Sequence, residues 1–175
     1  MKRLVVVGIA AAFLACAGLA LADEFDSKAV KSVTATFNAT TVKSLKKASC
    51  TNGDGTWTNA VAEYSGVASS SDSTLNGPVT LRLRSVINTT RDLGRVEGSL
   101  RIDTPSTDTI AEFEGVYASG KVVGLAEGRT GQSPGRLLAN LSASFSQTAG
   151  LSGGKIGGAD GGAALVFAPG TCGRK

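Results

Sequence analysis

The chain has no histidine, and its 175 residues include only one tryptophan, two tyrosines and one methionine. The lack of histidine excludes Ser-His-Asp and Cys-His catalysis and histidine-ligated zinc, and it removes the usual general base near neutral pH. The glycine-rich stretch at residues 150–162 has neither the Lys-Ser/Thr ending of a phosphate-binding loop nor Rossmann spacing, and we expect it to be a flexible hairpin loop. We therefore expect no cofactor, no metal and no catalytic residue of a common type.

Long hydrophobic runs are also scarce, and the one that is present lies at the N-terminus. Lys2 and Arg3 precede an apolar run at residues 4–14, and Ala20-Leu21-Ala22 has the small residues that a signal peptidase requires at positions −3 and −1. This pattern predicts a signal peptide over residues 1–22. It places the mature protein outside the cytoplasm, either secreted or in the periplasm or cell envelope, with no transmembrane segment after cleavage.

Two other interpretations of this segment stay open. The apolar stretch from residue 4 to residue 22 could just span a bilayer of about 30 Å as a membrane anchor. Phe13-Leu14-Ala15-Cys16 loosely resembles a bacterial lipobox, with Cys16 as the lipidated residue, although Phe13 stands where leucine is usual.

The mature chain is predicted to consist of a flexible leader, residues 23–31, and one all-β domain, residues 32–175. Without Lys2 and Arg3 it has 16 Lys and Arg against 14 Asp and Glu, so its net charge is only +2. That charge gives no indication of nucleic-acid binding. The one local basic cluster, Lys43, Lys46 and Lys47, is interpreted as a solvated strand end, or alternatively as a site for an anionic surface.

Cys50 and Cys172 both survive cleavage, and an even number of cysteines in an exported protein predicts a disulfide. The bond would close a loop of 123 residues and tie the start of the domain to its end. In the chain-entropy model such a bond stabilises the folded state by roughly 4–5 kcal/mol.

Alternating apolar and polar residues predict β-strands along most of the mature chain. Val79, Leu81 and Leu83 alternate with polar residues, and a similar strand at residues 95–102 follows after a short polar loop, which predicts an antiparallel hairpin. The alternation fails near Thr40 and Thr41, which indicates a bulge. About eight such strands with short connections predict an antiparallel meander, most simply a closed barrel and alternatively a β-sandwich.

The large rings Trp57, Tyr64, Phe113 and Tyr117 are the candidate ligand-binding residues, and filling the core is the alternative role for each. Glu112 and Glu114 would share one face of a strand about 7 Å apart, where they could serve glycoside hydrolysis or hold a metal. The simpler interpretation is a charged solvent face that meets Arg95 or Arg101. Likewise, the segment around Asp54 is interpreted as a plain turn rather than a calcium loop.

Two stretches carry resemblances. Residues 55–59, Gly-Thr-Trp-Thr-Asn, are similar to the first strand of avidin-type biotin-binding barrels, but the other tryptophans of that family are absent because Trp57 is the only one. Residues 64–77 and 138–143 resemble uncharacterised exported bacterial β-rich proteins, a resemblance that implies no activity.

The function hypothesis is an exported, non-enzymatic β-barrel that binds a small or extended ligand, or an envelope surface. The first alternative is a structural or adhesive envelope protein, favoured by the Ser/Thr/Gly-rich strands and the expected disulfide. The second is a histidine-free barrel enzyme of the dirigent or allene oxide cyclase type, which is suggested by architecture alone.

Overall fold

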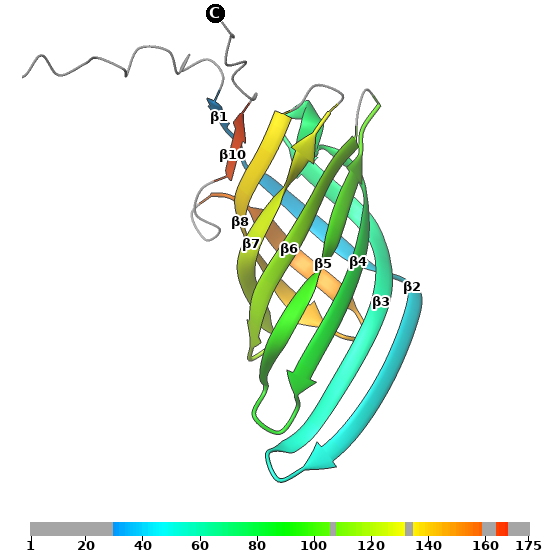
Figure 1. The fold of residues 1–175 in the computed structure, drawn as a ribbon. Helices are drawn as coiled ribbons and strands as arrows, with labels where there is room; N and C mark the ends of the chain where they lie inside the picture. Colours follow the sequence, from blue (N-terminus) through cyan, green and yellow to red (C-terminus); the bar gives the residue numbers. More distant parts are fainter. Residues whose placement is uncertain (1–29, 106–107, 132–134, 159–163, 168–175) are drawn as a thin grey trace, which may run out of the picture.

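The computed structural model describes residues 30–105, 108–131, 135–158 and 164–167, and almost all of them lie in β-strands. Eight antiparallel strands follow one another around a closed barrel (Figure 1). The prediction of an all-β meander that closes into a barrel is confirmed, and the β-sandwich alternative is wrong. The strands of the barrel are β2 (Ala35–Asn52), β3 (Gly55–Ser70), β4 (Gly77–Asn88), β5 (Leu93–Asp103), β6 (Asp108–Ala118), β7 (Lys121–Thr130), β8 (Gly135–Ser146) and β9 (Gly150–Ile156).

Strand β9 closes the barrel because it pairs on both sides. Ile156 lies opposite Ala35 of β2 and opposite Leu141 of β8. This stretch belongs to the glycine-rich segment for which a flexible loop was predicted, and that prediction is wrong for its first half. Glycine lets the chain pass close to a ring here, since a Cβ at Gly154 would collide with the side chain of Phe37.

Two short strands extend the sheet beside the barrel. Strand β10 (Ala164–Phe167) pairs with the first half of β8, and β1 (Val30–Ser32) pairs with β10. Of the predicted leader, residues 23–29 lie outside the described residues, and its last two residues belong to β1. The part of the chain that the structure describes contains no helix long and apolar enough to cross a membrane.

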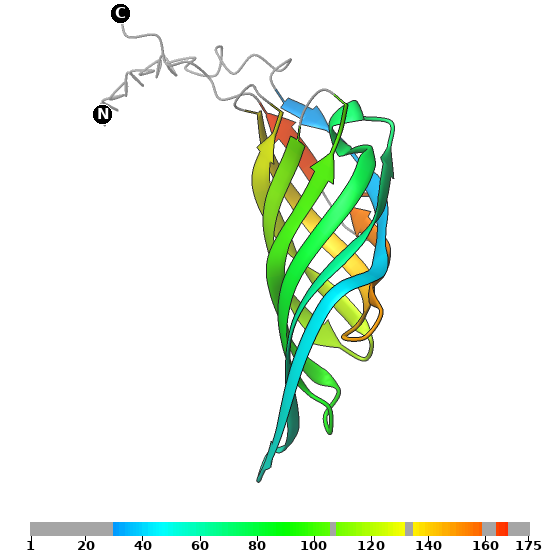
Figure 2. The same ribbon diagram turned by 90° about the vertical axis from the view of Figure 1, so that its right-hand side faces the viewer.

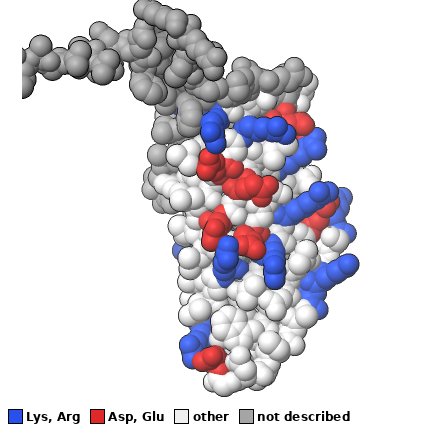
Figure 3. Space-filling model, viewed as in Figure 1, with Lys and Arg blue, Asp and Glu red and all other residues white. Residues whose placement is uncertain are grey.

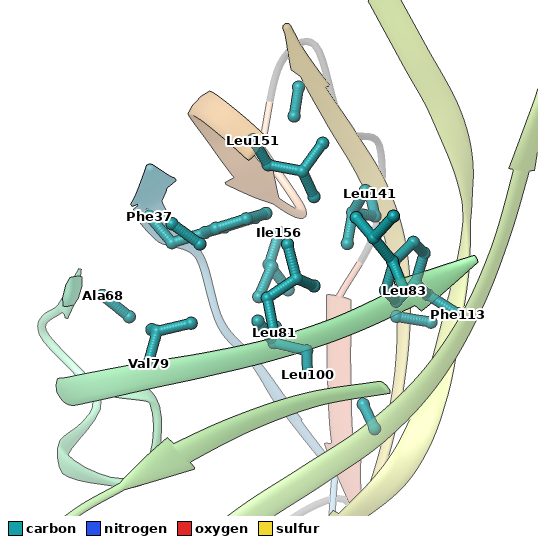
Figure 4. Packing of buried hydrophobic residues seen from close by; sticks show 14 of the residues in the cluster. Phe37, Ala68, Val79, Leu81, Leu83, Leu100, Phe113, Leu141, Leu151 and Ile156 are labelled. Atoms are coloured by element: carbon teal, nitrogen blue, oxygen red, sulfur yellow. The ribbon is translucent and has the colours of Figure 1, made fainter. Parts of the chain in front are cut away.

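Alternation along each strand sends one set of side chains into the barrel, where they fill it. Phe37, Tyr64, Leu81, Leu100 and Leu141 are each at most 1% exposed. In Figure 4 buried side chains from β2, β4, β5, β8 and β9 meet at the centre. Because almost none of their surface is exposed, these side chains leave no ligand-sized space around them.

A short 3-10 turn, η2 (Ser73–Leu75), covers the upper end of the barrel, which is the end where β1 and β10 lie in Figure 1. Leu75, its last residue, is completely buried, and the Thr109 hydroxyl donates a hydrogen bond to the Thr74 carbonyl at 2.6 Å. Asp72 caps the turn. One of its carboxylate oxygens accepts from the backbone N–H and the hydroxyl of Thr74, at 2.9 and 2.6 Å, and the other lies 2.9 Å from the Lys31 ammonium.

The turn between β8 and β9 covers the lower end. The Tyr64 hydroxyl donates to the Gln147 carbonyl at 2.8 Å, and burial raises the pKa of this hydroxyl. The Gln147 amide in turn donates to the Thr58 carbonyl at 3.2 Å and to the Ser85 hydroxyl at 3.0 Å. The polar groups inside this end are therefore paired with one another, which keeps their burial from being costly.

The hairpin formed by β2 and β3 projects below the rest of the barrel (Figure 2). Its strands are 18 and 16 residues long, but β9 accompanies β2 only from Ala35 to Ala39. The predicted bulge is confirmed by a register shift between Ala39 and Thr41, and a second shift lies between Val42 and Ser44. The two-residue turn Gly53-Asp54 joins the strands, and its Asp54 N–H donates to the Asn52 side chain at 2.9 Å, as expected for a plain turn.

The predicted disulfide is not formed. Cys50 is a free and exposed thiol near the tip of the projecting hairpin, and Cys172 lies outside the described residues. Phe167, the last described residue before Cys172, pairs with Arg136 at the opposite end of the barrel. Five further residues can extend at most about 18 Å, whereas the rise of β2 from Ala35 to Cys50 is about 50 Å. The prediction assumed that pairing of the first and last strands brings the two cysteines close, but the long hairpin carries Cys50 beyond the paired part of β2 and β9.

Asp72 makes the stability of the upper cap dependent on pH. Burial acts to raise the pKa of Asp72, but the hydrogen bonds from Thr74 and Lys31 and the charge of Lys31 together hold it below the usual value. A carboxyl group with a depressed pKa stabilises the fold at pH values above its unfolded pKa of about 3.9, and that contribution is lost as the pH falls through the folded pKa.

We therefore expect Asp72→Asn to lower the free energy of unfolding by about 1–2 kcal/mol at pH 7, and we expect the difference from wild type to shrink as the pH falls below about 4. Urea unfolding at pH 7 and at pH 3 measures both values. Asp54→Asn, at an exposed turn, is the matched control and should have little effect at either pH. A deficit of Asp72→Asn that stays constant with pH would contradict the assignment.

Candidate functional site

The outward-facing side chains of β3 to β8 form regular rows across the outside of the barrel, because register aligns neighbouring strands and alternate residues share a face. Two adjacent rows together hold seven charged side chains. The upper row consists of Glu63, Arg82, Ser99, Glu112, Glu127 and Leu138, and the lower row consists of Val61, Arg84, Glu97, Glu114, Leu125 and Asn140.

A groove of about 830 Å³ lies along these two rows, and we call it the outer groove. At its middle the short side chain of Ser99 of β5 leaves space between the long side chains of Arg82 and Glu112 on either side. Gly98, the next residue, lies in register with the buried Leu83, and a Cβ there would collide with the carbonyl oxygen of Arg82. Figure 3 shows the resulting face, with acidic and basic side chains crowded over its upper part and few charges on its lower part.

Carboxylates outnumber cations in the outer groove, whose lining includes five glutamates and only two arginines. Glu63 is paired with Arg82 at 2.8 Å, and Glu127 with Arg136 at 2.9 Å. Arg95, just below the groove, bridges Glu97 at 2.6 Å and Glu114 at 3.1 Å. Within the part of the chain that the structure describes, Glu112 has neither an ion pair nor a hydrogen bond.

Two pairs of these glutamates face each other directly across neighbouring strands. Glu97 of β5 lies opposite Glu114 of β6, and Glu112 of β6 lies opposite Glu127 of β7. Like charges in directly opposed positions destabilise a sheet. Arg95 offsets this cost for the first pair, whereas the second pair has no cation shared between its members. Folding does not require such an arrangement, and departures of this kind from local rules are expected mainly at functional sites.

Exposed apolar side chains border the acidic rows. Val61, Leu125 and Leu138 line the groove itself and are each more than 40% exposed. Val116 and Val123 lie opposite each other on β6 and β7, one row below the groove, and are 67% and 59% exposed. Together the groove and its border offer negative charge beside apolar surface, which suits a ligand with both cationic and hydrocarbon parts.

The four rings predicted to bind a ligand are not brought together. Tyr64 is buried in the barrel core, and Phe113 is 4% exposed beneath the outer groove. Trp57 lies half-buried on the outer face of the hairpin, directly opposite Cys50. Of the four, only Tyr117 lines a smaller hollow of about 280 Å³ at the lower mouth of the barrel.

Tyr117 is held in place at that lower mouth. Its ring meets Phe145 edge-on, with the ring centres 6.0 Å apart, and its hydroxyl donates to Asp92 at 2.7 Å. Burial, followed by the hydrogen bond and charge of Asp92, raises the pKa of Tyr117. The ring therefore stays protonated at neutral pH and acts as a wall of the hollow with a fixed orientation.

The structure also places the two glutamates that the sequence singled out. Glu112 and Glu114 do share the outer face of β6, and Glu114 meets Arg95, as the simpler interpretation expected. Arg101 binds Asp103 and Asp108 instead, at 2.7 Å each. The described residues contain no group of three or more acidic, cysteine or histidine side chains arranged to hold a metal ion.

Glu63, Glu97 and Glu127 complete the acidic groove and were missed by the sequence analysis. Each lies on an alternating strand and is unremarkable by itself. The signal that could have found them is the register of the meander, since short connections between β5, β6 and β7 align Glu97 with Glu114 and Glu112 with Glu127.

Removing the charge of Glu112 should stabilise the fold, because Glu112 faces Glu127 and has no cation of its own. We expect Glu112→Gln to raise the free energy of unfolding by a few tenths of a kcal/mol at low salt, and we expect the gain to fade as salt screens the pair. Glu63→Gln is the matched control, and it should be neutral or destabilising because Glu63 is paired with Arg82. Urea unfolding at low and high salt checks both, and equal effects of the two substitutions would rule out the like-charge cost.

Comparison of the chain with protein-family models, with curated proteins and with solved structures gave no match.

Proposed function

We propose that this protein is an exported, non-enzymatic binding module, and that its outer groove binds an organic polycation whose amines are separated by short apolar segments. The observation that carries this proposal is the pair Glu112 and Glu127, which face each other across β6 and β7. Glu127 is paired with Arg136, but among the described residues no cation bridges it to Glu112. A cationic ligand would turn this destabilising arrangement into a favourable one.

The spacing of the carboxylates supports an extended ligand rather than a single ion. Glu112 and Glu114 are two residues apart on β6, about 7 Å along the strand, and their partners on β5 and β7 lie one strand spacing to either side. An oligoamine can therefore place successive ammonium groups at successive carboxylates. Its methylene segments would then lie on Leu125 and Leu138, which are exposed in the same groove.

The packed interior favours the outside of the barrel as the place of binding. The central rings and leucines are almost inaccessible, so a ligand inside would have to displace them. The packing of the core therefore supports a ligand site on the surface of the barrel.

The packed interior also favours the second candidate, a structural or adhesive envelope module. The two proposals differ in what they require of the outer groove. A structural module depends on the core and tolerates neutral substitutions in the groove, whereas the binding module loses its ligand when the groove glutamates are neutralised.

Spermine is a suitable probe, because it carries amines separated by short methylene chains. We expect it to shift the backbone amide resonances of β5, β6 and β7, and we expect Glu112→Gln combined with Glu114→Gln to weaken its binding by at least about tenfold, or about 1.4 kcal/mol. NMR titration measures both the location and the affinity.

The matched control is Asp54→Asn combined with Asp92→Asn, which removes two acidic charges near the lower end, outside the groove. Asparagine tolerates the left-handed backbone at Asp92, where φ is 52°, and keeps an acceptor for Tyr117. This control should bind spermine as wild type does. Equal weakening in both double variants, or shifts spread over the whole surface, would show charge attraction without a site and would overturn the proposal.

Export is the other part of the proposal, and it rests on the signal-peptide pattern of residues 1–22. We expect the protein from its own host to leave the cytoplasm and to begin at Asp23. Intact-mass measurement of fractionated cells checks both points. A protein that retains residues 1–22, or one that begins at a lipidated Cys16, would instead establish a membrane anchor or a lipoprotein.

A further inference from the structure

The lower part of β2 has an open edge. From Ala35 to Ala39 this strand lies between β3 and β9, but from Thr40 to Asn52 the described structure pairs it with β3 alone. Its other side therefore faces solvent along the projecting hairpin, as Figures 1 and 2 show. Throughout residues 40–52 every side chain is exposed except that of Leu45, which is half-buried.

The geometry of the hairpin determines which backbone groups this edge presents. In a hairpin with a two-residue turn, the residues next to the turn form a hydrogen-bonded pair, and hydrogen-bonded and non-hydrogen-bonded pairs then alternate along the strands. Asn52, Cys50, Ala48 and Lys46 therefore direct their N–H and C=O groups toward β3. The intervening residues Leu45, Lys47, Ser49 and Thr51 direct theirs outward, where they are free to pair.

The regular part of the edge is as long as an ordinary strand. Register shifts interrupt the pairing with β3 near Thr40 and Lys43, but from Ser44 to Asn52 the register is unbroken. These nine residues extend for about 30 Å. The edge could therefore accept a complete additional strand, a known mode of peptide recognition in which backbone hydrogen bonds supply affinity.

The charge of the edge selects its partner. Residues 40–52 contain Lys43, Lys46 and Lys47 and no acidic residue. Lys46 and Lys47 lie opposite Val61 and Ala60 of β3, and the structure gives no ion pair to any of the three lysines among the residues it describes. Lysines on an edge strand discourage pairing with another copy of the same edge, because like charges would then meet. The same lysines attract a strand that carries carboxylates.

We propose that the β2 edge, residues 44–52, binds an extended acidic segment of a partner protein by adding it to the sheet as a strand. The backbone of Lys47, Ser49 and Thr51 would hydrogen-bond to the partner, and Lys43, Lys46 and Lys47 would pair with its carboxylates. This site touches the outer groove only at Ser44. The lysines of the edge and the glutamates of the groove are different residues, so either proposal can fail without affecting the other.

The test uses the full mature chain and two synthetic probes, a ten-residue peptide that alternates Glu with Val and its counterpart with Lys in place of Glu. We expect the acidic peptide to bind at least about tenfold more tightly, measured by fluorescence polarisation. Lys46→Glu combined with Lys47→Glu should invert the preference. Equal binding of both peptides, or binding of neither, would overturn the proposal.

Strand addition is distinguished from simple charge attraction by Ser49→Pro and its matched control Ser49→Ala. Both lose the hydroxyl that bonds to Thr58 at 2.9 Å, but only proline removes the outward N–H, and it does so without breaking a bond to β3. We expect Ser49→Ala to bind the acidic peptide as wild type does and Ser49→Pro to bind it at least about fivefold more weakly. Equal binding by the two variants would show that no strand is added.

Amide hydrogen exchange gives an independent readout at single residues. Bound acidic peptide should slow exchange at Lys47, Ser49 and Thr51, whereas Lys46 and Ala48 already donate to β3 and should change little. Uniform slowing at all five positions would contradict strand addition and would indicate general stiffening of the hairpin. A stable dimer through β2 that the peptide does not disrupt would also overturn the proposal, since the occupant would then be a second copy.

Discussion

The rest of the structure depends on the two-sided pairing of β9. This strand is only seven residues long, yet it bonds to β2 on one side and to β8 on the other, and so turns an open meander into a barrel. Closure pairs the backbone N–H and C=O groups of the edge strands over that length, and it directs alternate side chains into a common interior. The packing of Phe37, Leu81 and Leu141 and the outward display of the groove glutamates both follow from this one closure.

The same strand explains why closure is incomplete. Because β9 ends its pairing with β2 at Ala39, the remainder of a much longer β2 is left beside β3 alone. A two-stranded ribbon is marginally stable in water by itself. The upper part of the hairpin is anchored by the barrel, and Leu45 packs against the core, so the projecting part begins from a rigid base. An open edge with a fixed base is suited to pairing with another strand, because little backbone freedom is lost on binding.

The fold was predictable from local alternation, and the details that depend on contacts between distant segments were not. The alternation of Val79, Leu81 and Leu83 with polar residues determines which face of β4 is buried, whatever the partner strands are. The glycine-rich β9 has too few side chains to show alternation, and its strand conformation comes from backbone bonds to β2 and β8. The disulfide prediction failed for a related reason, since the projection of Cys50 beyond the barrel is not encoded near Cys50. Among the predicted rings, burial of Tyr64 and Phe113 reflects the general tendency of large rings to fill a core that has few of them.

The two proposed surfaces are of opposite charge, and they meet only at Ser44. Acidic side chains gather on the outer faces of β5, β6 and β7, whereas three lysines without acidic partners among the described residues, Lys43, Lys46 and Lys47, lie on the free part of β2. The net charge of +2 over residues 23–175 therefore hides an uneven distribution. Glutamates that face each other cost stability in the isolated protein, whereas exposed lysines without partners are hydrated and cost little. Natural proteins retain such destabilising features where binding of a partner offsets the lost stability. Here these features lie at solvent-facing positions, whose side chains do not take part in the packing of the barrel core.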